Sequence, residues 1–386
     1  MKFIHLSDLH LGKRVNDFPM IEDQRFILER ILEIIHEEKP KAVLIAGDVY
    51  DKPLPPAEAV KLFDDFISRL SKTDAEVFII SGNHDSAERL SFGSKIMDRQ
   101  GIHFAGGYDG STHCFSLDDE YGRVSFYMLP FVKPIHVRQA FADDGKAEEI
   151  ATYTDAVAFA IDKMGVDENE RNVLIAHQFC TGAQRSESED INVGGLDNVD
   201  ASVFSPFDYT ALGHLHGPQN AGDERVRYCG SPLKYSFSEA DQIKSVTIVE
   251  LGEKKNGTCA VHLRTPELVS LRNMKVLRGS FSELTDKNYY KHIETDDYMR
   301  IILTDEEDVI GALGSLRAIY PYIMRLEYDN TRTRSAAIVP DAEGNDGRTP
   351  LEIFDSLYKA QNGRGMDEEQ SRVVSSLIEK VWGGEK

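Results

Sequence analysis

Five short apolar runs, each typical of a buried β-strand, are followed by polar side chains that can bind a metal ion. The runs cover residues 2–6, 42–46, 77–81, 172–176 and 209–212. The polar residues that follow them are Asp8, His10, Asp48, Asn83, His177, His214 and His216. In sheets with helical crossovers, ligands gather at the carboxyl ends of the strands. We therefore expect the five loops to converge on one site.

The segments between the first three runs predict two amphipathic helices. They cover 21–38 and 56–70, where apolar side chains recur near a 3.6-residue period. A β-α-β-α-β order predicts parallel strands with right-handed crossovers. Shorter alternating strands are expected over 112–130 and a helix over 148–164. Later strand candidates, over 225–229, 245–251 and 260–264, predict a second sheet packed on the first.

The mixture of ligand types indicates the chemistry of the site. Imidazole nitrogens combined with carboxylate and amide oxygens suit Mn, Fe or Zn better than Mg or Ca. These side chains are too many for one ion and enough for two, and Asp48 is the best placed to bridge them. Two ions roughly 3.5–4 Å apart can activate water and stabilise both the attacking and the leaving oxygen of a phosphoryl displacement.

Two further polar residues follow Asn83 directly. His84 need not be a ligand, because it can act as a general acid or stabilise developing charge on a phosphate. Asp85 can orient His84, or it can serve as the N-cap of a helix expected to begin near Ala87. Both roles of Asp85 stay open from the sequence.

Three neighbours of these motifs are assigned ordinary roles. His5, inside the first strand, is expected to be a hydrogen-bonded core residue. Cys180 has no second cysteine nearby and is expected to be a small buried hydrophobe. Arg185, in the long polar loop over 178–199, is expected to be a solvated charge rather than a DNA-phosphate contact.

Taken in this order, the motifs resemble those of the calcineurin-like metallophosphoesterases. They are Asp8-x-His10, Gly47-Asp48, Gly82-Asn83-His84-Asp85, His177 and Gly213-His214-x-His216. A closer resemblance, to the SbcD family of nuclease subunits, extends over nearly the whole chain. That family is the bacterial relative of the Mre-type double-strand-break nucleases. The closer likeness is carried by residues 4–12, 46–51, 82–86, 208–216, 226–233 and 236–239.

The resemblance implies an α/β fold, a two-sheet α/β/β/α metallophosphoesterase sandwich with a small α/β capping domain and C-terminal helices. It implies one metal ion held by Asp8, His10, Asp48 and His216. A second ion would be held by Asp48, Asn83, His177 and His214, and the metal is usually manganese. His84 would be the catalytic histidine that is not a ligand. Asp51 stands where archaeal and eukaryotic members often carry a second histidine, so no histidine role is carried over there.

The same resemblance implies partners and an activity. The family works as a homodimer with an SMC-type ATPase, SbcC, within a heterotetramer. Its activities are ATP-dependent double-strand exonuclease and single-strand endonuclease, including hairpin opening, in DNA end processing, replication, repair and recombination. We therefore expect DNA as substrate and a cytoplasmic, nucleoid-associated protein.

Changes of composition divide the chain into four segments. Residues 1–265 form the expected nuclease domain and 266–330 the capping domain, with strands over 299–303 and 323–328 around a helix over 307–318. Residues 331–348, rich in polar residues and Gly, predict a linker. Residues 349–386 predict two amphipathic helices that dock on the same chain or on a partner, and the resemblance implies that they dock on the ATPase. The first begins at Thr349-Pro350, and Asp367 caps the second.

Net charge, the length of apolar runs and the cysteine pattern limit the classes of protein to which the chain can belong. A formal charge of -21 argues against a free-standing nucleic-acid-binding protein, although bound cations or a partner subunit can supply positive charge. No apolar run approaches the roughly 20 residues that span a bilayer, and four scattered cysteines fit a reducing compartment. Two rivals stay open: a phosphomonoesterase or cyclic-nucleotide phosphodiesterase on the same site, and a scaffold or DNA-end tether with a degenerate site.

Overall fold

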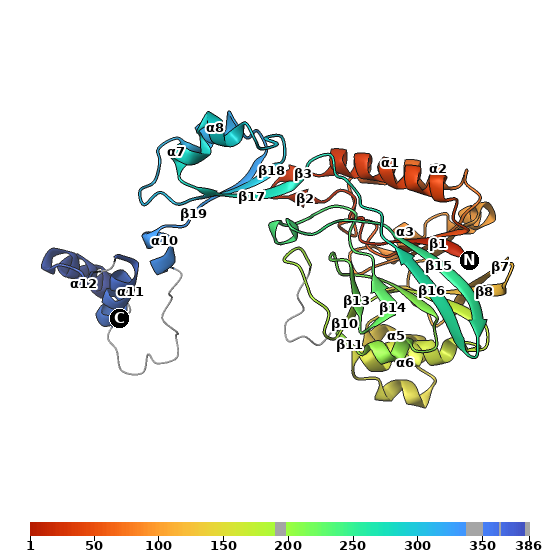
Figure 1. Cartoon of the computed structure of the whole chain (residues 1–386). Helices are drawn as coiled ribbons and strands as arrows, with labels where there is room; N and C mark the ends of the chain where they lie inside the picture. The colour runs from red at the N-terminus through yellow and green to blue at the C-terminus, as the bar shows by residue number, and fades with distance from the viewer. Residues whose placement is uncertain (190–197, 337–349, 363, 383–386) are drawn as a thin grey trace. The chain divides into compact units, whose positions relative to one another are not determined.

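The computed structural model describes residues 1–189, 198–336, 350–362 and 364–382. The chain divides into two compact units, Met1–Met274 and Lys275–Lys386 (Figure 1). In the described part of the chain, no helix combines the length and apolar character that crossing a membrane requires.

The first sheet of the larger unit contains the predicted parallel strands. Its strands, in spatial order, are β16 (Thr258–Arg264), β15 (Thr247–Lys255), β1 (Lys2–Leu6), β4 (Ala42–Ala46), β5 (Glu76–Ile80) and β6 (Ile102–Ala105). The last four are parallel to one another, as the β-α-β order predicts. Their carboxyl ends therefore lie at the same edge of the sheet.

The second sheet is built from the middle of the chain. Its spatial order is β13 (Gln219–Ala221), β14 (Asp223–Tyr228), β12 (Tyr209–Gly213), β9 (Arg171–His177), β8 (Gly122–Leu129) and β7 (His113–Asp119). β8, β9, β12 and β14 are parallel to one another, whereas β13 pairs antiparallel with β14 and β7 forms an antiparallel hairpin with β8. This hairpin matches the short strands expected over 112–130.

The prediction that strands 245–251 and 260–264 belong to the second sheet is wrong. β15 pairs antiparallel with β1, with Ile4 opposite Ile248, and β16 then pairs with β15. Both strands therefore extend the first sheet beyond β1. An apolar run predicts a strand, but it carries no information about which sheet edge that strand will join.

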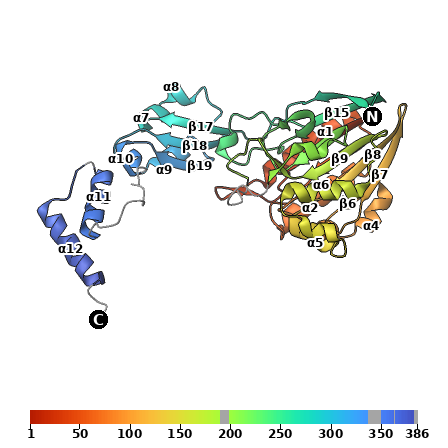
Figure 2. The same cartoon turned by 90° about the horizontal axis from the view of Figure 1, so that it is seen from below.

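An apolar core between the two sheets joins them face to face. Phe3 of β1 makes edge contacts with Phe126 of β8 and Tyr209 of β12, at ring-centroid distances of 5.7 and 5.6 Å. Helices α1 (Ile21–Glu38) and α2 (Ala57–Leu70) lie outside one sheet, and α5 (Pro134–Ala140) and α6 (Tyr153–Met164) outside the other (Figures 1 and 2). The α/β/β/α sandwich is confirmed.

Helix boundaries follow local capping chemistry. α1 has the predicted bounds, and Pro56 is the N-cap of α2. α6 begins at Tyr153 rather than 148, because Thr152 and Asp155 form a reciprocal capping box and residues 145–149 form a 3-10 turn. The remaining short strands and α-helices of this unit are β2 (Arg14–Val15), β3 (Phe18–Pro19), α3 (Ala87–Leu90), α4 (Ser94–Met97), β10 (Phe179–Cys180) and β11 (Asn198–Val199).

The smaller unit contains a three-stranded sheet in the order β17 (Met274–Gly279), β18 (Tyr298–Leu303) and β19 (Ile323–Tyr328). The strands predicted over 299–303 and 323–328 are confirmed, whereas β17 was not predicted. Its short helices are α7 (Phe281–Leu284), α8 (Lys287–Tyr290) and α9 (Ala312–Arg317). The helix predicted over 307–318 is reduced to α9, because its N-cap is Gly311 in the left-handed conformation.

The C-terminal part of this unit contains three helices among the described residues. α10 (Thr331–Ala336) occupies the start of the segment predicted as a linker. α11 (Pro350–Asn362) begins at the predicted proline, whereas the predicted Thr349 cap lies outside the described residues. Asp367 caps α12 (Glu368–Trp382), since its Oδ1 accepts hydrogen bonds from the backbone N–H of Glu369 and Gln370.

Candidate metal centre

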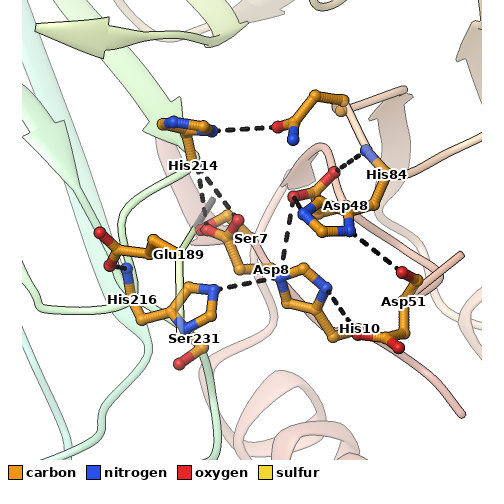
Figure 3. A network of polar contacts seen from close by, with 12 residues as sticks. Ser7, Asp8, His10, Asp48, Asp51, His84, Glu189, His214, His216 and Ser231 are labelled. Atoms are coloured by element: carbon orange, nitrogen blue, oxygen red, sulfur yellow. Dashed lines mark hydrogen bonds and ion pairs between the residues drawn. The ribbon is translucent and has the colours of Figure 1, made fainter. Parts of the chain in front are cut away.

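The strand ends of both sheets bring all of the predicted ligands together (Figure 3). Three groups place their ligand atoms within 4.8 Å of one another: Asp8 with His10 and His216, Asp8 with Asp48 and His177, and His10 with Asp48 and His84. Asn83 joins them through its Oδ1, which lies 3.0 Å from both His177 Nε2 and His214 Nδ1. The sequence prediction of convergence is therefore confirmed.

The backbone at this edge is held in unusual conformations. Asp8, His10, Asp48 and His214 have positive φ angles of 53°, 44°, 50° and 103°. Such conformations cost energy for residues other than glycine and cluster at functional sites. The loops after β1 and β4 hold each other, since His10 N–H donates to Asp48 O at 2.9 Å. The geometry thus fixes the directions of the side chains before any ligand binds.

Two motif glycines are required by close approach rather than by a turn. A Cβ on Gly82 would lie 2.1 Å from Asp48 Oδ1, and a Cβ on Gly213 would lie 1.8 Å from the Ala46 carbonyl oxygen. Both distances are far inside van der Waals contact. Gly82 lets the loops after β4 and β5 of the first sheet approach each other, and Gly213 lets β12 of the second sheet approach β4 of the first.

One half of the centre lies around Asn83. His177 Nδ1 donates to the Ala46 carbonyl at 2.8 Å, so its Nε2 turns inward. That Nε2 lies 3.3 Å from Asp48 Oδ2. His214 presents its Nδ1 to Asn83. Two imidazole nitrogens, an amide oxygen and a carboxylate oxygen therefore face the same space.

The other half lies around Asp8, His10 and His216. The Nε2 atoms of His10 and His216 are 3.1 Å apart, and His10 Nε2 is 3.7 Å from Asp48 Oδ2. Ser7 Oγ donates to Asp8 Oδ2 at 2.5 Å, and the His214 N–H donates to the same carboxylate. Asp48 stands between the two halves, as its predicted bridging role requires.

The charge states of these buried groups fit a cation. Burial lowers the pKa of His214 to about 3 and holds the pKa of His10 well below its usual value, so both are neutral at pH 7. Asp48 keeps a lowered pKa despite burial, because His177 lies beside it. His10, His214 and Asp48 therefore offer lone pairs of nitrogen and oxygen to the centre. This donor set fits divalent metal ions.

Comparisons with known proteins agree with this geometry. The calcineurin-like phosphoesterase family model matches residues 1–218. A second family model, the type 5 capsule protein repressor C-terminal domain, matches residues 270–362. The D subunit of the nuclease SbcCD from Staphylococcus epidermidis is 31% identical over 387 residues, which cover 98% of each chain.

The chain belongs to the SbcD family of calcineurin-like phosphoesterases.

Two solved structures also match this SbcD-family chain. The calcineurin-like phosphoesterase YfkN from Bacillus subtilis is 17% identical with a TM-score of 0.35, covering 69% of this chain and 90% of its own. TT1561 of Thermus thermophilus is 10% identical with a TM-score of 0.38, covering 69% and 99%. At these TM-scores neither likeness supports a conclusion, and family membership depends on the sequence matches.

His84 of this SbcD-family chain lies at the rim of the centre. Its backbone N–H donates to Asp48 Oδ1 at 2.9 Å, and its Nδ1 donates to the Asp51 carbonyl at 3.0 Å. Its Nε2 is 3.9 Å from Asp48 Oδ2, and its side chain is 19% exposed, compared with at most 2% for His10, His177 and His216. The position suits contact with a substrate, although His84 also belongs to one of the three groups of ligand atoms.

The N-cap interpretation of Asp85 is wrong. The cap of α3 is Ser86, whose hydroxyl accepts from the Arg89 N–H. The carboxylate of Asp85 instead accepts hydrogen bonds from the backbone N–H groups of Val49, Tyr50 and Gly82. It therefore joins the loop after β4 to the loop after β5. Burial raises the pKa of Asp85 to about 6.

The ordinary roles assigned to neighbouring residues are partly confirmed. His5 is fully buried and contacts the Tyr209 hydroxyl at 3.0 Å, and Cys180 is buried in the core of the second sheet. The description of Arg185 as a solvated charge is wrong. Its guanidinium lies over the Phe179 ring, 3.6 Å from the centroid, and Phe179 packs beside His214.

Sequence reasoning missed the residues that support the ligands from behind. Gln24 Nε2 donates to the His10 carbonyl at 2.7 Å, and the Tyr235 hydroxyl donates to the Leu9 carbonyl at 2.5 Å. Ser188, Glu189 and Glu239 surround His216. Only Glu239 carried a signal, since 236–239 formed part of the family likeness.

Proposed function

We propose that this chain is the nuclease subunit of an SbcCD-like complex and hydrolyses DNA phosphodiester bonds with two divalent metal ions. One observation carries the proposal. Asp8, His10 and His216 gather on one side of Asp48, and Asn83, His177 and His214 on the other. A shared carboxylate between two ligand sets is the arrangement that in-line displacement at phosphorus uses.

The residues of the centre have separate tasks in this proposal. Asp8, His10, Asp48 and His216 would hold one ion, and Asp48, Asn83, His177 and His214 the other, with Mn²⁺ as the metal. Bound ions supply Lewis-acid stabilisation of the reacting oxygens. His84, with its Nδ1–H held by the Asp51 carbonyl, presents Nε2 as a proton donor to the leaving oxygen or as a contact to the phosphate. Asp85 acts on His84 through the loop that both share.

The C-terminal helices are proposed to bind an SbcC-like, SMC-type ATPase. Large apolar side chains on α11 and α12 are exposed to solvent: Phe354 and Leu357 at 43% and 41%, Val373 and Leu377 at 56% and 55%. Exposed apolar patches of this kind mark interaction sites. ATP would then control access of double-stranded DNA ends to the centre.

A homodimer within a heterotetramer is proposed for the complex. Phe92, between α3 and α4, is 84% exposed and Ile96 of α4 is 75% exposed, which favours burial against a second copy. Phe92→Asp should shift the purified chain toward monomer in sedimentation equilibrium. An unchanged mass would place the dimer contact elsewhere.

The segment roles follow the same proposal. Residues 1–265 are assigned to the nuclease domain, 266–330 to the capping domain, 331–348 to a linker and 349–386 to the helices that bind the ATPase. The compact units themselves divide between Met274 and Lys275. A cytoplasmic, nucleoid-associated location is part of the proposal, since DNA is the substrate.

The test compares the purified chain with its Asp48→Asn variant. Both are incubated with Mn²⁺ and a hairpin-ended DNA labelled at one position, in parallel with a generic phosphomonoester, with and without a copurified ATPase subunit and ATP. Metal-dependent DNA cutting that the partner enhances and the variant lacks is expected. Turnover of the small ester with DNA intact in every reaction would refute the nuclease and favour a phosphomonoesterase.

A further inference from the structure

The segment over 184–189 is attached to two side chains that follow His216 in the chain and to His216 itself. Gln184 N–H donates to Gln219 Oε1 at 2.8 Å, and Glu187 N–H donates to Ser238 Oγ at 3.1 Å. The His216 N–H donates to the Glu189 carboxylate at 2.6 Å. A loop far from His216 in the sequence therefore lies directly against this ligand.

Within that segment, the Ser188 hydroxyl lies between His216 and a buried carboxylate. Ser188 Oγ is 2.7 Å from His216 Nδ1 and 2.5 Å from Glu239 Oε1. An ionised carboxylate can only accept hydrogen bonds, and a serine hydroxyl has one proton to donate. That proton goes to Glu239, so Ser188 Oγ accepts from His216 Nδ1–H. The lone pair of His216 then lies on Nε2, which faces His10.

A buried lysine keeps this arrangement charged and in place. Glu239 is fully buried, and Lys244, only 4% exposed, donates to its Oε2 at 2.6 Å. The same ammonium donates to the His216 carbonyl at 2.8 Å and to Ser231 Oγ at 3.0 Å. Lys244 therefore supports both the carboxylate and the backbone of the ligand it orients.

The ring of His177 is oriented by a different kind of contact. Its outer nitrogen donates to the main-chain carbonyl of Ala46, within the rigid strand β4. His216 instead depends on side chains from a loop and from a separate segment. The two halves of the centre are thus supported by elements of different kinds.

We propose that Ser188 and Glu239 are positioning residues that hold His216 in its Nδ1–H tautomer, so that Nε2 is the ligand atom. This inference rests on the proposed function, because it takes His216 to be a metal ligand. Partners that orient histidine ligands typically change metal affinity by about 10–100-fold when they are removed.

The test uses the full chain and three single variants. Ser188→Ala removes the hydroxyl, Ser188→Thr restores it, and Ser238→Ala is the matched control, which removes a loop contact that does not touch His216. The tautomer of His216 is read from the ¹⁵N chemical shifts of its ring in metal-free protein. Mn²⁺ affinity is measured by calorimetry.

We expect the wild type, Ser188→Thr and Ser238→Ala to show the Nδ1–H tautomer. In Ser188→Ala, Glu239 Oε1 stays 3.4 Å from Nδ1, a long contact. This variant should therefore show mixed tautomers and bind one of two Mn²⁺ ions about tenfold more weakly. An unchanged tautomer and affinity in Ser188→Ala would overturn the inference. An equal loss in Ser238→Ala would assign the effect to loop docking instead of the hydroxyl.

A second pair of variants tests the carboxylate, and the double variant of this pair leaves neither buried charge unpaired. Glu239→Gln combined with Lys244→Met removes both charges, whereas Lys244→Met alone leaves Glu239 present. Loss of the Nδ1–H tautomer in the double variant only is the expected result, and its retention would overturn the role of Glu239. His216→Ala separates the two proposals: if it still binds two ions with wild-type affinity, the ligand assignment fails, whatever the tautomer measurements show.

Discussion

Single residues of the metal centre carry protons that a bound ion would displace. Burial raises the pKa of Asp8 to about 8. Burial also lowers the pKa of His177, but the neighbouring Asp48 carboxylate outweighs this effect and raises it to about 9. Without a metal ion, both groups hold a proton at pH 7. As ligands, both must lose it.

Mn²⁺ binding should therefore release protons and strengthen as pH rises. Below pH 8 both groups are protonated in the metal-free protein, so affinity should fall as pH falls and level off above about pH 9. Calorimetry at pH 7 in buffers of different ionisation enthalpy should report about two protons released. A binding enthalpy that is independent of the buffer would contradict this prediction. Asp48→Asn is the control for site-specific binding.

Single variants should distinguish the role of His84 from that of the proposed ligands, because metal content and cleavage rate should respond differently. His84→Ala should lower the rate of DNA cleavage by about 10²–10⁴-fold while both ions stay bound, because its task is proton donation or charge stabilisation. His177→Ala, the control, should lose an ion together with activity. Metal content by atomic emission and cleavage rate are measured on the same samples. Loss of an ion from His84→Ala would make His84 a ligand, which its place among the grouped ligand atoms permits.

Sequence reasoning found the proposed ligands but not the residues that support them, for a physical reason. Asp8, Asp48 and His177 follow apolar runs that identify strand ends, and strand ends of parallel sheets meet. Ser188 and Glu189 lie in an aperiodic loop, where nothing local indicates which ligand they will contact. Gln24 lies on α1 among other polar residues, so its contact with His10 depends on tertiary packing alone.

At the scale of elements, close contact between strands of different sheets explains the glycine at position 213. Gly213 ends β12 and lies against the Ala46 carbonyl of β4. The parallel order of β1, β4, β5 and β6 followed from the sequence, because crossover helices impose it. The place of β15 and β16 in the first sheet did not follow from the sequence. β15 pairs antiparallel with β1, and this pairing joins residues that lie far apart in the sequence, such as Ile4 and Ile248.

Gly213→Ala should destabilise the larger unit. Its Cβ would lie 1.8 Å from a main-chain oxygen, which cannot move aside as a side chain can. We expect a loss of about 3 kcal/mol in the free energy of unfolding, measured by denaturant titration of metal-free protein. Gly145→Ala is the control, since nothing lies within 4 Å of its added Cβ. Equal stability of the two variants would show that the strands separate without cost.

At the scale of the whole molecule, net charge and activity have to be reconciled. A chain of formal charge -21 does not attract DNA by itself. The bound ions add positive charge at the centre, and a partner subunit can supply the remaining contacts. In the proposed function, the exposed apolar side chains of α11 and α12 offer surface to such a partner.

Charged substitutions on the exposed apolar faces of α11 and α12 should abolish stimulation by ATP without affecting the metal centre. Phe354→Asp and Val373→Asp change side chains that are 43% and 56% exposed, so the fold should be retained. We expect loss of copurification with the ATPase and of ATP stimulation, while Mn²⁺ binding stays at the wild-type level. Lys359→Ala, an exposed polar position on α11, is the control. Copurification that survives both substitutions would place the partner elsewhere.

The division of ligands between the sheets has a consequence for folding. Asp8, His10, Asp48 and Asn83 come from the first sheet, and His177, His214 and His216 from the second. In the proposed assignment, neither layer alone holds a complete ligand set, so a bound ion would act as a clasp that links the two halves of the sandwich. Ion affinity is then part of the cohesion between the layers, and metal scarcity would leave the chain easier for proteases to open.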